Sequence, residues 1–358
     1  MAELTPMQRA QLFANFTRLH YQTGGSVAGA ENSRVSIEVP KSRLLSKIRL
    51  MVELTLTATH AADADYTPAP HAPYSFVKNV EVKMNNGFSP FNVSGTSLYF
   101  YNMLRTTSEC ISPLFDSAAN VLASRRRCVQ GISSAAAGQA NTVRFMLDLP
   151  LTLNDRDPAG IILAQNPQTT IDIMVDLGSA SDLATAAAGY TFAVSNVLIT
   201  PFFETFSIPD IDDAKPDLSI LKLVQQQSQP VAGAGLQTVR LVTGNTYRKL
   251  LVYIEDAAGG ETDTDLGASL MKLVLNTADY PVEVHPRILQ AINEETYGRT
   301  LPNGLFVFDW ASLQGIANYA GSRDYFDTED LTEFWLQFTA AGAGNVTVIT
   351  ETLTKLRQ

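Results

Sequence analysis

The sequence contains an internal repeat, and this repeat limits the folds that are open to the chain. The segment at 34–59, RVSIEVPKSRLLSKIRLMVELTLTAT, is echoed 202 positions later by QTVRLVTGNTYRKLLVYIED. At this offset Lys47 matches Lys249, and apolar residues match apolar ones, as Ile37 matches Val239. Both copies alternate with period two and are rich in Val, Ile, Leu, Thr and Tyr, which favours half-buried β-strands. A repeated pair of strands predicts a repeated domain.

The order of elements continues in parallel along both halves. A predicted strand around Val80 matches one around Val274 at an offset of 194. A helical stretch follows in both halves, at 96–105 and at 286–297. Both halves are therefore predicted to begin with three strands and a short helix.

An insertion then lengthens the first half. It spans roughly 108–140 and contains a predicted helix at 113–129, and beyond it the offset falls to 161. Offsets that shrink while the elements keep their order are typical of a duplication with unequal loops. Three later strands match in this way, at Asp148 with Asp309, Ile173 with Leu336 and Val194 with Val348.

Each half is predicted to hold about eight short strands without βαβ alternation. Antiparallel strands of this number and spacing form a sandwich of two sheets, most often a jelly roll. The 358 residues suit two cores, because single cores stop growing near roughly 250 to 300 residues. The predicted fold is all-β with a few helices: an N-terminal helix and flexible arm at 1–33, jelly roll 1 at 34–207, a linker with a short helix near 218–227 at 208–235, and jelly roll 2 at 236–358.

The segment at 4–21 is the strongest candidate for an amphipathic helix. Its apolar side chains recur at helical spacing, and two arginines lie away from them. Such a helix either packs on its own domain or docks onto a partner subunit or an anionic membrane surface. The residues predicted to make that contact are Arg9, Leu12, Phe13, Phe16, Arg18 and Leu19.

Charge and hydropathy narrow the possible partners. Charged residues make up 17% of the chain, below the average of about 25% for soluble domains, which predicts that much of the surface is covered by partners. The formal net charge of −10 disfavours non-specific or direct binding of nucleic acid. The sequence lacks an apolar run of about 18 residues and the apolar core of a signal peptide, so we expect a soluble chain made in the cytoplasm.

Motifs of known chemistry are missing from the sequence. It has no Walker A motif, no GxGxxG after a strand, no HExxH and no GxSxG. His60 and His71 share a loop but have no third ligand nearby. Cys110 and Cys128 are spaced wrongly for a metal knuckle and are predicted to be free thiols. We therefore expect no catalytic residue, no cofactor and no metal.

Two acidic clusters admit two interpretations. Carboxylates that gather in this way can bind Ca²⁺, but a solvated linker, favoured by Pro209 and Pro216, is preferred for the first cluster and an acidic turn for the second. The first cluster is Asp210, Asp212, Asp213 and Asp217, and the second is Asp263 and Asp265.

Arg125, Arg126 and Arg127 form the one concentrated basic run. Arginine makes bidentate contacts with carboxylates and phosphates, which favours a contact with a neighbouring subunit or with lipid. The alternative is a solvated helix end. Trp310 and Trp335 fall on predicted strands of the second half, where we expect them to pack in the core.

The architecture resembles that of one viral protein family. Two predicted jelly rolls, an N-terminal amphipathic helix, helices at matching places and phrases such as RFMLDLPLTLNDRDPAGIILAQNPQTTIDIMVDL are similar to the major capsid proteins of tailless, membrane-containing icosahedral bacteriophages, the tectivirus-like double jelly-roll lineage. The resemblance implies a homotrimer with a pseudo-hexagonal footprint, upright jelly rolls, outward loops and an N-terminal helix that faces an internal membrane. Neighbouring capsomers, penton proteins and minor capsid proteins are the implied partners, and the virion is the implied location.

The sequence thus predicts a structural, non-enzymatic shell protein. Two similar domains in one chain allow three copies to present six similar edges, which can tile a hexagonal lattice. A minor capsid or spike protein is one alternative. A carbohydrate-binding or glycan-hydrolysing double jelly roll is another, although no pair of loop carboxylates stands out for that chemistry.

Overall fold

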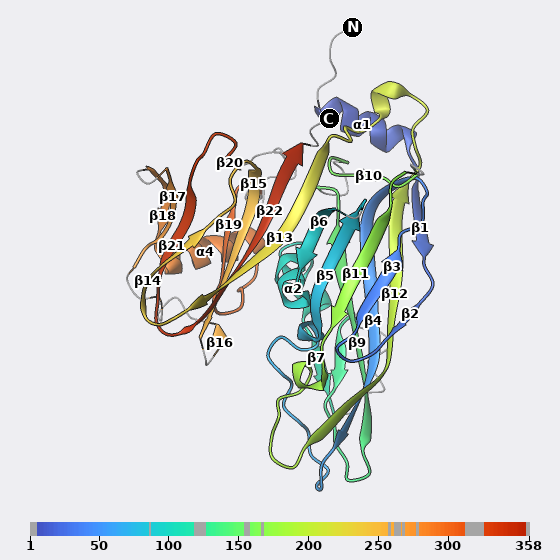
Figure 1. The fold of residues 1–358 in the computed structure, drawn as a ribbon, viewed down its shortest axis with the longest axis vertical. Coiled ribbons are helices and arrows are strands. Elements are labelled where there is room, and N and C mark those ends of the chain that lie inside the picture. Colours follow the sequence, from blue (N-terminus) through green and yellow to red (C-terminus); the bar gives the residue numbers. More distant parts are fainter. Residues whose placement is uncertain are drawn as a thin grey trace. The chain divides into compact units, whose positions relative to one another are not determined.

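The chain divides into two units, Met1–Leu221 (unit 1) and Lys222–Gln358 (unit 2), in the computed structural model (Figure 1). This boundary falls inside the predicted linker. The structure describes residues 6–85, 87–117, 127–153, 158–165, 168–256, 259–260, 266, 269–276, 279–311 and 326–355.

Unit 1 is built from strands with a few short helices beside them. The strands are β1 (Leu19–Thr23), β2 (Val27–Gly29), β3 (Arg34–Glu38), β4 (Leu44–Thr59), β5 (Val77–Met84), β6 (Phe88–Val93), β7 (Leu114–Asp116), β8 (Val129–Gly131), β9 (Gln139–Pro150), β10 (Ile162–Leu163), β11 (Ile171–Leu177) and β12 (Thr191–Phe206). The α-helices are α1 (Pro6–Phe16), α2 (Gly95–Met103) and α3 (Ser108–Ile111), and the 3₁₀ helices are η1 (Tyr74–Phe76), η2 (Ala180–Asp182) and η3 (Asp212–Ala214).

These strands of unit 1 form two facing sheets (Figure 1). One has the order β1-β12-β4-β9-β8-β7, with β2 also on β12 and β10 on β4. The other has the order β6-β5-β11-β3. Strand β4 illustrates how the sequence builds the sandwich, because Ile48, Leu50, Val52, Leu54 and Leu56 are buried while the residues between them are only half-buried. This period of two points one face of the strand into the core.

Unit 2 repeats this plan with shorter elements. They are β13 (Ile220–Val231), β14 (Gly235–Arg240), β15 (Thr246–Asp256), β16 (Gly259–Gly260), β17 (Met271–Leu275), β18 (Asp279–Val284), α4 (Pro286–Tyr297), β19 (Leu305–Asp309), β20 (Phe326–Asp327), β21 (Phe334–Ala340) and β22 (Gly344–Lys355). One sheet contains β13-β22-β15 with β19, β16 and β20 also on β15, and the other has the order β14-β21-β17-β18. Their inner faces form one core, in which Leu250, Val252, Leu273 and Leu336 are fully buried.

Both units have the connectivity of an eight-stranded jelly roll. In unit 1 the eight principal strands are β1 with β2, then β3, β4, β5, β6, β9, β11 and β12, and in unit 2 they are β13, β14, β15, β17, β18, β19, β21 and β22. In chain order, the first, eighth, third and sixth strands form one sheet of each unit, and the second, seventh, fourth and fifth form the other. The predicted fold class is confirmed.

The ladder registers confirm part of the repeat residue by residue. Ile37 of β3 pairs with Ile173 of β11 in unit 1, and Val239 of β14 pairs with Leu336 of β21 in unit 2. These are the two matches that the sequence predicts for these strands. The second and seventh strands of the two units are therefore aligned as expected.

Other predicted matches are wrong in register. Val82 and Leu273 occupy equivalent ladder positions, so the offset between β5 and β17 is 191 instead of 194. The predicted match of Val80 with Val274 is therefore wrong by three positions along the strand. A shift by an odd number of residues exchanges the two faces of a strand. Val194 and Val348 are mismatched as well, because the ladders relate β12 to β22 at an offset of 147 beyond the bulge between Ser195 and Leu198, and not at 154. Short apolar strands look alike at several offsets, and only pairing partners distinguish them.

The helix predictions are partly confirmed. Helices α2 and α4 lie at the two predicted places. The N-terminal helix ends at Phe16, and the last residues of the predicted segment, from Leu19, belong to strand β1. The predicted helix at 113–129 is wrong where the structure describes it, because it contains β7 and the first residue of β8.

The first strand of each jelly roll is missing from the predictions. Strands β1 and β2 fall in the predicted flexible arm, and β13 replaces the predicted linker helix near 218–227. The sequence of β13, ILKLVQQQSQPV, is rich in Leu, Lys and Gln, which have high helix propensity. Strand β1 is mostly exposed and lacks apolar alternation. Tertiary pairing with β12 and β22 decides the conformation of these segments.

Candidate interaction surfaces

Helix α1 is held at one end of unit 1 by a small apolar cluster. Phe13 is buried against Leu44 and Ile161, and its ring meets that of Phe206 edge-on, with 5.1 Å between the centroids. Leu44 begins β4 and Phe206 ends β12, so the helix covers the ends of the two longest strands of the unit. One residue of the predicted contact set is therefore used inside unit 1.

The other predicted contact residues of this segment lie on its outer side. Phe16 and Leu19 are exposed, at 49% and 43%, and Arg9 and Arg18 are exposed as well. Leu12 is half-buried. The predicted single apolar face is thus divided, because Phe13 points into unit 1 whereas Phe16 and Leu19 remain in solvent. The outer side combines large apolar groups with two positive charges.

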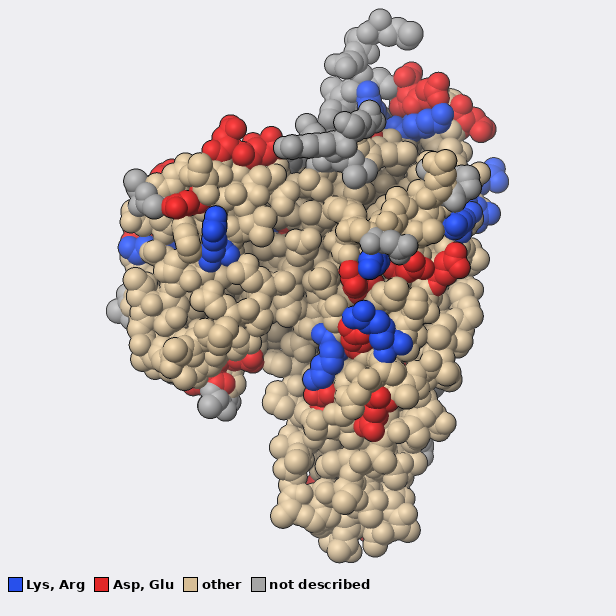
Figure 2. Space-filling model, in the orientation of Figure 1, with Lys and Arg blue, Asp and Glu red and all other residues tan. Residues whose placement is uncertain are grey.

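The opposite end of unit 1 has a different surface. The loops that follow β4 and precede β12 lie there (Figure 1), and on the face seen in Figure 2 this end is almost free of charged side chains. His60 and Tyr190 stack with 4.2 Å between ring centroids, and Tyr190 also stacks with Phe192 at 5.9 Å. These three rings form an aromatic group at this end. Unit 1 thus has one end covered by α1 and an opposite end built of loops, which carries few charged side chains on the face seen in Figure 2.

Arg127 belongs to a charged strip on the outer side of β12, β4 and β9. Its guanidinium lies 2.9 Å from Asp148, and Arg49 lies 2.6 Å from Glu204. Lys47 also approaches Glu204, at 3.8 Å. The two carboxylates of this strip are neutralised inside unit 1. Arg125 and Arg126 lie outside the described residues.

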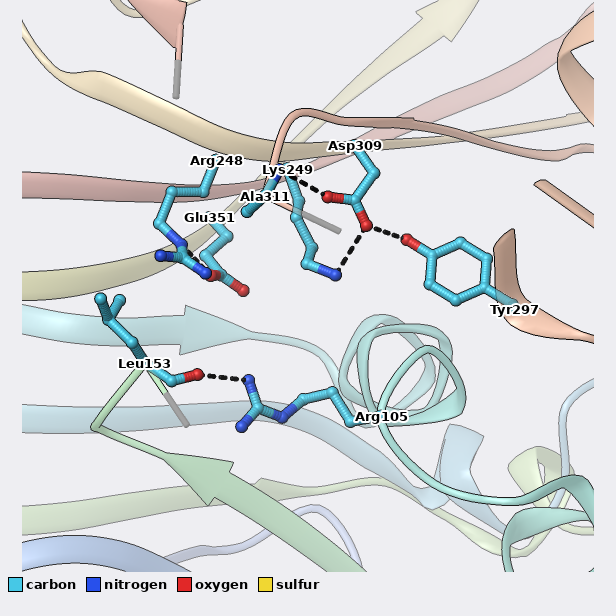
Figure 3. A network of polar contacts seen from close by, with 8 residues as sticks. All are labelled: Arg105, Leu153, Arg248, Lys249, Tyr297, Asp309, Ala311 and Glu351. Carbon is cyan, nitrogen blue, oxygen red and sulfur yellow. Dashed lines mark hydrogen bonds and ion pairs between the residues drawn. The ribbon is translucent and has the colours of Figure 1, made fainter. Parts of the chain in front are cut away.

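Unit 2 carries a corresponding group of buried ion pairs (Figure 3). Arg248 donates from Nε to Glu351 Oε1 at 2.8 Å, with both side chains buried. Lys249 Nζ lies 2.7 Å from Asp309 Oδ2, and the Tyr297 hydroxyl donates to the same oxygen. Each carboxylate of this group is thus paired with a cation inside unit 2.

The repeat extends to these charges. Lys47 lies opposite Glu204 on the β4–β12 ladder, and Lys249 lies opposite Glu351 on the β15–β22 ladder. Asp148 lies opposite Arg49, whereas Asp309 lies opposite Lys249, so the predicted match of the two aspartates is displaced by two positions along the strand. An even displacement keeps both aspartates on the outer face of their sheets. In the sequence, the match of Lys47 with Lys249 indicates this repeated pair of charges. The carboxylates opposite them, Glu204 and Glu351, are not predicted from the sequence.

The acidic cluster at the end of unit 1 is exposed and locally paired. Asp212 forms an ion pair with Lys215 at 2.6 Å, and Asp217 accepts hydrogen bonds from Ser219. Among the described residues no group of three or more His, Cys, Asp or Glu side chains could hold a metal ion. The second acidic cluster, Asp263 and Asp265, lies outside the described part of the chain.

Cys128 lies in a buried group of residues in unit 1, while Cys110 is exposed. Burial raises the pKa of the Cys128 thiol to about 12, and burial also raises the pKa of Tyr66 to about 12. The Tyr74 hydroxyl donates to the carbonyl oxygen of Ile111 at 2.9 Å, which ties α3 to η1. The thiol of Cys128 is thus protonated and inert at neutral pH.

The two tryptophans have different environments. Trp310 is half-buried, packs against the core of unit 2 and stacks on Phe326. Trp335 lies on the outer face of β21, where the guanidinium of Arg240 is 5.8 Å from its ring centroid. The prediction of core packing is therefore wrong for Trp335. Its half-buried ring makes a cation–π contact instead.

None of the helices in the described residues has the length and apolar content needed to cross a bilayer.

Comparison with known proteins gives a whole-chain match in structure. No protein-family model matches the sequence, and no curated protein matches it. The major capsid protein of STIV, Sulfolobus turreted icosahedral virus, is similar with a TM-score of 0.69 and 17% identity over 94% of this chain and 97% of that one. The PBCV-1 virus capsid protein gives 0.62 and 12% over 94% and 93%, and the major capsid protein P2 of bacteriophage PM2 gives 0.56 and 9% over 95% and 99%. At these identities the likeness is one of fold, and the two jelly rolls of this chain have the fold of viral major capsid proteins.

Proposed function

We propose that this chain is a major capsid protein that forms the shell of an icosahedral virion. The supporting observation is the similarity to the STIV major capsid protein, which covers 94% of this chain and 97% of that one. A match of both jelly rolls together says more than a match of one, because single jelly rolls occur in proteins of many functions. The proposed role is structural and non-enzymatic.

The proposed assembly unit is a homotrimer with a pseudo-hexagonal footprint. Units 1 and 2 share one connectivity and equivalent ladder positions, so three chains would present six similar jelly rolls. A ring of six similar units can be surrounded by six neighbours and so can tile a shell. Neighbouring capsomers, penton proteins and minor capsid proteins are the partners that such a shell requires.

The outer side of the N-terminal segment is the proposed contact with an internal membrane. Phe16 and Leu19 supply exposed apolar area, while Arg9 and Arg18 supply charge for lipid phosphates. Phe13 is the anchor that holds this segment to unit 1. The contact is thus proposed for an outer set of four residues, with Phe13 and Leu12 behind them.

A subunit contact remains proposed for the basic run at Arg125, Arg126 and Arg127. Arg127 is half-buried and already pairs with Asp148, so we assign it the role of anchoring the run to unit 1. The proposed location is the virion, after synthesis in the host cytoplasm.

Copy number tests the proposal. Gel densitometry of purified virions is expected to find this chain as the most abundant protein, with copies in the hundreds. A minor capsid or spike protein would instead be present in a few tens of copies at most, confined to the vertices. That result would overturn the shell role while keeping the virion location.

A further inference from the structure

Helices α2 and α4 occupy equivalent places in the two jelly rolls. Their N-caps are Ser94 and His285, which lie 191 positions apart, the same offset that relates β5 to β17. In this alignment Leu98 of α2 matches Leu289 of α4. Both side chains are buried, on the face of each helix that packs against its own unit. The N-caps and the buried face thus agree on one register for the two helices.

The outer positions of these helices differ sharply in exposure. In α2, Ser97 and Tyr101 are 2% and 1% exposed. The matched residues of α4 are Ile288 and Ile292, which are 57% and 45% exposed. At these two positions α4 has isoleucines and is exposed to solvent, whereas α2 has a serine and a tyrosine and is buried. Isoleucines at positions i and i+4 form a continuous apolar stripe on a helix.

The packing around the two helices explains the difference in part. Helix α2 packs against η1 and α3 as well as against β5 and β9. The ring of Tyr99 stacks on Tyr74 of η1, with 4.5 Å between the centroids. In the described part of unit 2, the main contact of α4 is with β19. The outer face of α4 therefore has the composition of an interface core, but no cover in the single chain among the described residues.

We infer that the Ile288 and Ile292 face of α4 is the surface through which unit 2 binds a second copy of this chain within the capsomer. This inference rests on the proposed trimer. In unit 1 the equivalent helix is covered by η1 and α3 of the same unit, whereas unit 2 offers only β19 as a main contact in the described residues. In a ring of six similar jelly rolls made from three chains, unit 2 lies beside a neighbouring chain, and we assign the missing cover to that copy. Exposed charged neighbours, Arg287 and Glu295, would lie at the rim of this contact.

Paired charge substitutions test this surface. The chain with Ile288→Glu and Ile292→Glu is expected to fold, because both side chains are exposed, and its circular dichroism melt should match that of the parent. Its trimers should dissociate in sedimentation velocity, with the dissociation constant raised by about 100-fold or more. Leu236→Glu is the matched control, since Leu236 is 68% exposed on β14 of the same unit, and this variant should keep the trimer.

The outcomes separate the inference from the proposed function. A monomeric parent chain contradicts the proposed trimer itself. Trimers that survive Ile288→Glu with Ile292→Glu, or that dissociate equally with Leu236→Glu, overturn only the α4 surface. A photo-crosslinking residue placed at Ile292 gives a second readout. It should produce a band at twice the chain mass from the purified protein, and the absence of that band in intact trimers would also overturn the assignment.

Discussion

Arg248 and Glu351 form an ion pair in the interior of the protein, with Nε 2.8 Å from Oε1 and the carboxylate side chain fully buried. A charge in such a place is stable only with its partner, because removing one partner leaves the other desolvated. We expect Glu351→Gln to destabilise unit 2 by ~3 to 5 kcal/mol, measured by urea unfolding. The exposed pair of Arg34 and Asp176 is the control, and Arg34→Ala should cost far less stability than Glu351→Gln because solvent screens this pair. Equal costs at the two sites would contradict this account.

The pH dependence of stability should report on His71. Burial lowers the pKa of this imidazole, whose ring packs edge-on against Phe100 at 5.2 Å. The unfolded chain therefore binds a proton more readily than the folded one, so stability falls as the pH drops through the ordinary histidine pKa of about 6.5. His71→Asn tolerates the positive φ of this position. Urea midpoints between pH 5 and 7.5 should fall more steeply for the parent than for this variant, and parallel curves would exclude the effect.

The two cysteines should react at very different rates. Cys110 is exposed, whereas burial raises the pKa of the Cys128 thiol to about 12. The thiolate is the reactive species, so a disulfide reagent at pH 8 should modify one thiol quickly and the second only after unfolding. Cys110→Ser should remove the fast phase. A fast phase that persists in this variant would show that Cys128 is accessible.

Phe13 and Phe16 make a matched pair for testing how α1 is held. Phe13→Ala removes the anchor of the helix, so hydrogen exchange of the α1 amides should become faster. Phe16→Ala removes an exposed ring and should leave exchange in α1 unchanged. Vesicles with anionic headgroups should bind the Phe16→Ala chain more weakly than the parent. Equal vesicle binding would argue against the proposed membrane contact.

The repeat was readable from the sequence because inward-facing residues must be apolar at every second position in both jelly rolls. Ile37 with Val239 and Ile173 with Leu336 are aligned correctly, since β3 with β11 and β14 with β21 are paired strands with one buried face. That alternation cannot distinguish between nearby offsets, which is why Val80 was matched with the wrong residue of β17. Register depends on pairing partners that lie far away in the chain.

The first strand of each jelly roll could not be predicted for a related reason. Strands β1 and β13 have little apolar alternation of their own, and β13 has the composition of a helix. They are strands because β12 and β22 offer free edges to pair with. Similarly, the exposed isoleucines of α4 are recognised only when the structures of α2 and α4 are compared at equivalent positions. The sequence of α4 alone, PRILQAINEETY, does not reveal which isoleucines its own unit leaves uncovered.

The central claim is that three copies of this chain form the assembly unit of a shell, and the mass of the purified protein tests it most directly. Mass photometry across a range of concentrations should find a dominant species of three times the 38.9 kDa chain. A chain that stays monomeric at every concentration would contradict the account.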